Sequence, residues 1–232
     1  MSKDFKKYAL LLIAGLVICS MSCEKDSKGG GDGGGFVIEA KNVIGGNDDI
    51  ATVKASMWKS GEEGIIATGK YENNGFKLTL PATLDSKYLS TIGDAPAGVN
   101  VSNPNAKVRE TDYFSAYDKN DNRIGMLFIS VEETTNRRVK ATYLYADRSF
   151  SITGSYTEEN TTETFDCSLK RGWNTIYSIE ESGDGCSYFT LTTKKTSDVT
   201  FNWHYFDITF GKTPAANLRD KHFGKILTPA KR

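Results

Sequence analysis

The sequence has no excess of charge, because 29 Lys and Arg residues balance 29 Asp and Glu residues among 232. This balance argues against a nucleic-acid partner, since binding driven by counterion release needs a basic surface. Long hydrophobic runs are also missing: the longest, Tyr8 to Ile18, has 11 residues. A membrane-spanning helix needs about 20 apolar residues, so the sequence excludes a polytopic membrane protein.

Histidine is scarce, with only His204 and His222, and the second lies in a C-terminal tail. Two such residues are too few to favour histidine-based catalysis or a zinc site. The sequence also has no Gly-x-Ser-x-Gly, no His-Glu-x-x-His and no phosphate-binding glycine loop. We therefore expect a protein that is not an enzyme and that holds no metal and no cofactor. A hydrolase built from pairs of Asp and Glu residues stays open as an alternative.

The N-terminus has the pattern of a secretory signal. Three lysines precede the apolar run, and small residues follow it up to Ser22-Cys23. A small residue before a cysteine, after an apolar core, resembles a bacterial lipobox, which implies that Cys23 becomes the mature N-terminus and carries lipid. Cys19 suits this role less well, because the residue before it is the large, branched Ile18. We expect residues 1–22 to be the signal peptide, with a plain cleaved signal as the alternative.

Residues 23–35 contain the lipidated cysteine and a glycine-rich linker, in which six of the last seven residues are Gly. Such a sequence has almost no side chains to bury and is typical of a flexible tether. Its acidic start resembles the surface-export signal of Bacteroidetes lipoproteins, although Lys25 and Lys28 offset part of the negative charge. We therefore expect a protein anchored to the outer membrane by lipid and exposed at the cell surface, with a periplasm-facing orientation as the alternative.

The body of the chain, from about residue 36 to residue 210, is predicted to be all β. It alternates apolar and polar side chains with a period of two, which places alternate residues on opposite faces of a sheet. In Gly75–Leu80, for example, Phe76, Leu78 and Leu80 share one face. No stretch shows a convincing helical period except in the tail. About ten short strands separated by turn residues indicate an antiparallel β-sandwich, with a calycin-like β-barrel as the alternative.

Three short blocks recur in the same order within the body. VKAS at residues 53–56 resembles VKAT at 139–142, and TGKY at 68–71 resembles TGSY at 153–156. The Phe-x-Leu-x-Leu of residues 76–80 resembles the Phe-x-Cys-x-Leu of residues 165–169. This order predicts two similar β units in tandem, residues 36–117 and 118–210. Alternatively, such short patterns recur in any β protein. Residues 211–232 form a basic tail, with six Lys and Arg residues against Asp220.

Several blocks resemble a group of uncharacterised Bacteroidetes envelope lipoproteins, in which a lipobox and a polar linker precede a β-rich domain. The blocks are residues 75–84, 118–126, 141–154, 169–177 and 202–206. The resemblance covers about residues 1–206, and the tail after Phe206 departs from it. It implies an envelope location and a β fold, but it implies no activity and no functional residues.

Cys167 and Cys186 are the only cysteines outside the signal and lipid region. In an oxidising compartment two thiols can form a disulfide. If the strands around them form a meander, however, the cysteines lie two strands apart, about 9–10 Å at the usual strand spacing. This separation exceeds the Cα distance of about 7 Å that a disulfide can bridge. The sequence therefore leaves the pairing of these two thiols open.

Two further patterns could bind a ligand. Trp58, Trp173 and Trp203 could stack on sugars if they were exposed on one face, although aromatic side chains are more often core residues. The segment Asp118–Asn122 has the oxygen density of a calcium loop, but Arg123 stands where an EF-hand needs Gly and Ile129 where it needs an acid. We interpret this segment as a hairpin turn.

The sequence thus favours a lipid-anchored binding or adhesion module without catalysis, whose partners are the membrane and a glycan or protein ligand. The alternative is a barrel that holds a small apolar ligand.

Overall fold

The computed structural model describes residues 35–59, 61–111, 113–130, 136–196 and 199–208. These residues form strands, and the one helical element among them is the short 3-10 turn η1 (Ser86–Tyr88). The predicted all-β fold is therefore confirmed. No helix in these ranges is long and apolar enough to cross a membrane. The predicted signal peptide, Cys23 and the basic tail 211–232 lie outside the described residues.

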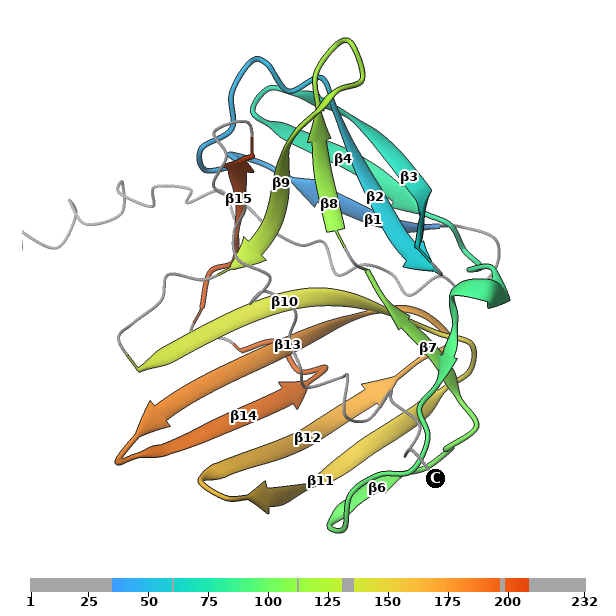
Figure 1. Cartoon of the computed structure of the whole chain (residues 1–232), viewed down its shortest axis with the longest axis vertical. Coiled ribbons are helices and arrows are strands. Elements are labelled where there is room, and N and C mark those ends of the chain that lie inside the picture. The colour runs from blue at the N-terminus through green and yellow to red at the C-terminus, as the bar shows by residue number, and fades with distance from the viewer. Residues whose placement is uncertain (1–34, 60, 112, 131–135, 197–198, 209–232) are drawn as a thin grey trace, which may run out of the picture.

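The strands form two curled groups that pack against each other as a sandwich (Figure 1). The first group contains β1 (Phe36–Ala40), β4 (Gly75–Leu80), β3 (Glu62–Glu72), β2 (Thr52–Lys59), β8 (Tyr113–Tyr117), β9 (Arg123–Ser130) and β15 (Asn202–Asp207). Neighbours pair in this order, and every pairing in the group is antiparallel.

The second group contains β10 (Arg137–Ala146), β13 (Gly172–Gly183), β14 (Cys186–Thr192), β12 (Thr161–Leu169), β11 (Phe150–Glu158) and β6 (Val99–Val101), again in order of pairing. The short strands β7 (Lys107–Glu110) and β5 (Ser90–Thr91) extend it beyond β10. The pair β12 and β14 is parallel, whereas the other pairings are antiparallel. The two groups are joined through the pair Lys140 and Ser130 on β10 and β9.

The period-two pattern of the sequence correctly placed the buried faces. In β4, Phe76, Leu78 and Leu80 are buried, while Lys77 and Thr79 are exposed. β2 departs from this alternation because both of its faces are covered. Lys54 is only 9% exposed, since its ammonium group pairs with Asp121 and lies over the ring of Tyr117.

Two apolar clusters form the interior. The first fills the first group and also takes in Tyr143, Tyr145 and Trp173 from β10 and β13, so it extends across the contact between the two groups. The second cluster lies on the other face of the second sheet, where strands β10 to β14 and the short strands β6 and β7 enclose it. One face of β10 and β13 therefore packs on the first group, and the opposite face packs on the second cluster.

The strands do not group along the predicted units 36–117 and 118–210. β9 and β15 belong to the second predicted unit but pair within the first group. Conversely, β5, β6 and β7 belong to the first predicted unit but pair within the second group. The tandem repeat itself stays a prediction. Among the described strands, β1 pairs with β4 alone and β6 with β11 alone, so these pairings do not close a calycin-like barrel.

Candidate binding face

Two of the three tryptophans predicted to stack on a ligand are core residues instead. Trp173 is 7% exposed, its indole Nε1 donates to the carbonyl oxygen of Pro81 at 2.8 Å, and its ring meets Tyr145 edge-on. Trp203 is 4% exposed and lies edge-on to Phe76 and Phe114. Neither can stack on a ligand, because each stands on the inward face of its strand, as is more usual for aromatic side chains.

Trp58 is the one predicted tryptophan that reaches the surface. It lies near the end of β2 and is 40% exposed, and its carbonyl oxygen accepts a hydrogen bond from Arg109 Nη2 at 2.9 Å. The structure does not bring it together with Trp173 or Trp203, which are buried. The predicted cluster of three stacking tryptophans is therefore not formed.

Cys167 and Cys186, whose pairing the sequence left open, are both free thiols. The strands around them do not form the meander considered above, since β12 pairs directly with β14 in parallel. In that register Asp166 lies opposite Thr192, whereas Cys186 begins β14 just before the pair Thr161 and Ser187. The cysteines thus stand at opposite ends of neighbouring strands. The buried Cys167 thiol donates to the carbonyl oxygen of Leu191 at 3.3 Å.

The segment Asp118–Asn122 is the turn between β8 and β9, as interpreted from the sequence. The Asp118 carboxylate accepts hydrogen bonds from the backbone N–H groups of Asn120 and Asn122 and from the Asn122 side-chain amide. These bonds hold the pKa of Asp118 below its usual value. Within the described part of the chain, no group of three or more His, Cys, Asp or Glu residues could hold a metal ion.

A uniform set of groups that can form hydrogen bonds lies on the outer face of β11, β12 and β14, which turns away from the second core. We call it the hydroxyl face. Its side chains alternate along each strand with those of the core, and nearly all of them carry a hydroxyl group. They are Ser151, Thr153, Ser155 and Thr157 on β11, Thr162, Thr164, Asp166 and Ser168 on β12, and Tyr188 and Thr190 on β14, where the next residue of this face, Thr192, is buried.

Strand pairing arranges these hydroxyl groups in rows. Thr157 lies opposite Thr162, with their Oγ1 atoms 3.1 Å apart, and Thr162 lies opposite Tyr188. In the next row along the strands, Ser155 lies opposite Thr164, and Thr164 lies opposite Thr190 on β14. Neighbouring strands lie about 4.8 Å apart, and residues on one face of a strand repeat about every 6.8 Å. The face therefore offers a regular array of donors and acceptors.

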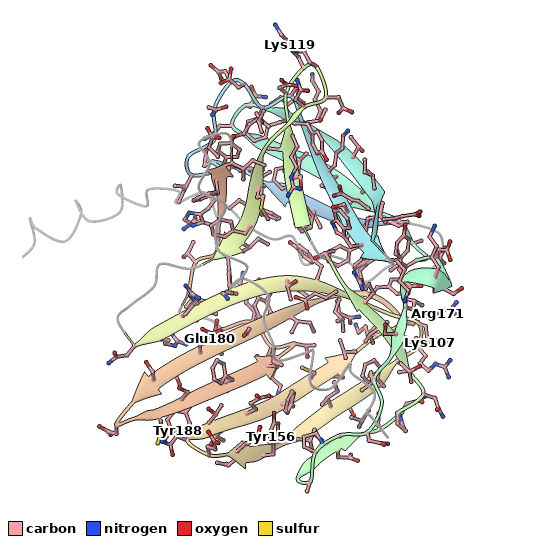
Figure 2. All side chains as sticks on the ribbon, viewed as in Figure 1. Lys107, Lys119, Tyr156, Arg171, Glu180 and Tyr188 are labelled. Atoms are coloured by element: carbon pink, nitrogen blue, oxygen red, sulfur yellow. The ribbon has the colours of Figure 1, made fainter. Side chains whose placement is uncertain are left out.

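Tyr188 is the aromatic residue of this face and is 48% exposed. It lies toward the end of the second group away from the turns that carry Arg171 (Figure 2). A ring at this exposure has a free apolar surface and a polar tip, which suits a ligand that is apolar on one side and hydroxylated at its edge. Charge is limited on the face, since its Asp166 carboxylate is paired with Lys194 at 2.6 Å.

The opposite face of the same sheet carries a second polar row, across five strands. Directly opposite residues are Arg138, Glu180, Phe189, Glu163 and Tyr156. Tyr156 is hydrogen-bonded to Glu163, and burial together with this carboxylate raises the pKa of the Tyr156 hydroxyl. Glu163 is only 4% exposed, and Glu180 lies 4.0 Å from Lys140. This row lies on the face of the second core, so the hydroxyl face is the more accessible of the two.

Sequence reasoning missed the hydroxyl face because it searched for tryptophan. The signal that marks it is the repetition of Ser or Thr at every second position, as in residues 151–157 and 162–164. Comparisons with protein-family models, with curated proteins and with solved structures find no match for this chain. The resemblance to Bacteroidetes envelope lipoproteins therefore stays a prediction from the sequence blocks alone.

Proposed function

We propose that this protein is a lipid-anchored binding module of the cell envelope that holds a polysaccharide on its hydroxyl face and catalyses no reaction. The observation that carries the proposal is Tyr188, 48% exposed beside rows of Ser and Thr side chains. The lipobox at Cys23 and the linker after it support attachment to the outer membrane, with the body displayed at the cell surface.

A polysaccharide fits this face on chemical grounds. The C–H side of a sugar ring is apolar and can stack on the Tyr188 ring, while its equatorial hydroxyls can exchange hydrogen bonds with Thr162, Thr164 and Thr190. Each such contact is weak, because it replaces hydrogen bonds to water. Affinity would come from several sugar units bound at once along the rows, which favours a polymer over a single sugar.

The test is binding of the purified full chain to an array of bacterial and host polysaccharides, followed by titration with the best ligand. We expect Tyr188→Ala to weaken binding about 10- to 30-fold, as for a central aromatic contact. Tyr188→Phe keeps the ring and should stay within a few-fold of the wild type. Trp58→Ala is the matched control, because Trp58 is similarly exposed but lies on another strand group. Failure of every polysaccharide to bind, or equal binding by Tyr188→Ala, would overturn the proposal.

A further inference from the structure

The second group of strands has opposite charge at its two ends. At one end lie Lys107, Arg148, Lys170, Arg171, Lys194 and Lys195, all exposed, which we call the basic rim. Two of these cations are paired with acids, Arg148 with Asp147 at 2.9 Å and Lys194 with Asp166 at 2.6 Å. At the other end, Glu158, Glu159, Glu180, Glu181 and Asp184 outnumber Arg137 and Arg138. The two ends are set by strand direction, since β10, β12 and β14 finish where β11 and β13 begin.

Hydrogen bonds hold the turns of the basic rim together. The Lys107 backbone N–H donates to the Asp147 carboxylate, and the Asp147 N–H donates to the Lys107 carbonyl oxygen. The Arg171 N–H donates to the Ser149 hydroxyl at 3.1 Å, which links the next pair of turns. Figure 2 shows Lys107 and Arg171 close together at this end, with Glu180 toward the other. Among the described residues, Lys170 and Arg171 form no salt bridge, whereas the charge of Lys107 acts on the nearby Asp147 carboxylate.

The start of β1 lies next to this rim. Phe36 pairs with Leu80, and the following residue, Pro81, accepts the hydrogen bond from Trp173. Trp173 is two residues from Arg171, about 7 Å along the strand. The ring of Phe36 also contacts Tyr143, near the rim end of β10, at 5.4 Å between centroids. Residues 24–35 separate Phe36 from Cys23, and twelve residues can span at most about 40 Å.

We propose that the basic rim faces the membrane and binds the phosphate-rich surface of anionic lipids. This proposal rests on the lipid anchor of the proposed function. A lipid at Cys23 would hold the β1 end of the body near the bilayer, and this is the end at which the rim cations gather. Lys and Arg side chains near an anionic leaflet are attracted to it, and one acyl anchor combined with a basic patch binds more stably than either alone. The acidic end and Tyr188 would then point away from the membrane, toward a ligand.

The experiment measures which end approaches the bilayer. The full chain with its lipid is reconstituted in vesicles of phosphatidylcholine alone or with phosphatidylglycerol, and one fluorophore is attached per molecule. The native Cys186 reports the acidic end, and Ser168→Cys in a Cys186→Ser background reports the rim. We expect a headgroup-bound quencher to quench the rim reporter at least about twofold more than the Cys186 reporter, only in anionic vesicles, with the difference lost at high salt.

Substitution of Lys107, Lys170 and Arg171 by Gln should abolish this difference. The control replaces Lys41, Lys70 and Lys119 by Gln, which removes the same charge from exposed sites in the first group, where Lys119 occupies the far tip (Figure 2). Thermal unfolding of both triple variants checks that they fold. Equal quenching of both reporters in anionic vesicles, or loss of the difference in the control as well, would overturn the proposal.

Two further experiments test the rim without the lipid anchor and against a polysaccharide ligand. If Cys23 carries no lipid, the anchor fails, but sedimentation of the unlipidated full chain with anionic vesicles still tests the rim. There the Gln variant should bind on the order of 10- to 100-fold more weakly than the wild type. If soluble dextran sulfate binds the rim more tightly than anionic vesicles at equal salt, the rim recognises a polyanionic polysaccharide, and the membrane-facing assignment is wrong.

Discussion

The indole Nε1 of Trp173 donates to the carbonyl oxygen of Pro81 at 2.8 Å, which ties the second group of strands to the first. Because Trp173 is buried among residues of both groups, its replacement should loosen the contact between them. We expect Trp173→Phe to lower the free energy of unfolding by about 2–4 kcal/mol, from the lost hydrogen bond and the smaller ring. Urea denaturation measures this loss. Trp58→Phe, at an exposed site, should change the free energy of unfolding by less than about 0.5 kcal/mol. Equal losses in the two variants would contradict the role of Trp173 in joining the two groups.

Gly154 on β11 should tolerate no side chain. Its φ is +111°, and an added Cβ would lie 2.1 Å from the carbonyl oxygen of Gly98. We expect Gly154→Ala to destabilise the protein by about 2–4 kcal/mol, from backbone strain and the clash with neighbouring backbone. Gly183→Ala is the control, because a Cβ there meets nothing within 4 Å. The melting temperatures of the two variants are compared. Equal melting temperatures would show that the backbone at Gly154 can accommodate a Cβ atom.

Cys167 should remain unreactive in the folded protein. Burial raises the pKa of its thiol from 9.0 to about 12, so the thiolate that reacts is nearly absent at pH 8. In the Cys186→Ser variant, we expect labelling of Cys167 by a thiol reagent only after unfolding. Fast labelling of Cys167 in the native protein would contradict its placement.

The same raised pKa predicts a dependence of stability on pH. The unfolded chain releases the Cys167 proton near pH 9, whereas the native state retains it to about pH 12. The native state therefore binds more protons in this window, and stability should fall by up to about 1.4 kcal/mol per pH unit as the pH rises above 9. Below pH 9 the contribution is fully present. Denaturation of the wild type and of Cys167→Ala at pH 8 and pH 10 isolates the contribution of Cys167. An equal loss of stability between the two pH values in both proteins would contradict this contribution.

Asp121 combines an ion pair with an unusual backbone conformation. Its carboxylate pairs with the nearly buried Lys54, and its φ is +64°. Asp121→Asn keeps a residue that tolerates this conformation and should cost about 1 kcal/mol for the lost pairing. Asp121→Ala should cost about 1 kcal/mol more, because Ala is strained there. Chemical denaturation of both variants tests this, and equal stabilities would show that the turn is not strained.

The alternation of side chains allowed much of the fold to be predicted. It identified which residues of β4 face a core, because burial of alternate residues depends only on the period of the strand. It could not identify which strands pair. The parallel pairing of β12 with β14 and the position of β15 beside β9 depend on contacts between segments far apart in sequence. For this reason the boundaries of the predicted units differ from the observed grouping of the strands.

The candidate site was harder to predict than the fold. An aromatic residue in a strand can face a core or a ligand, and the sequence period alone does not decide between them. Trp173 and Trp203 proved to face inward, whereas Tyr188, which was not singled out, is exposed on the hydroxyl face. Only the packing of the second group on the first shows which sheet face stays accessible.

The central claim is that a lipid on Cys23 holds a body made of strands, which binds its ligand and leaves it unchanged. The most direct test is the intact mass of the mature protein extracted from its membrane. The account predicts a chain that begins at Cys23, lacks residues 1–22 and carries the added mass of acyl groups at its N-terminus. A mature chain without acyl groups, or one that begins at another residue, would contradict it.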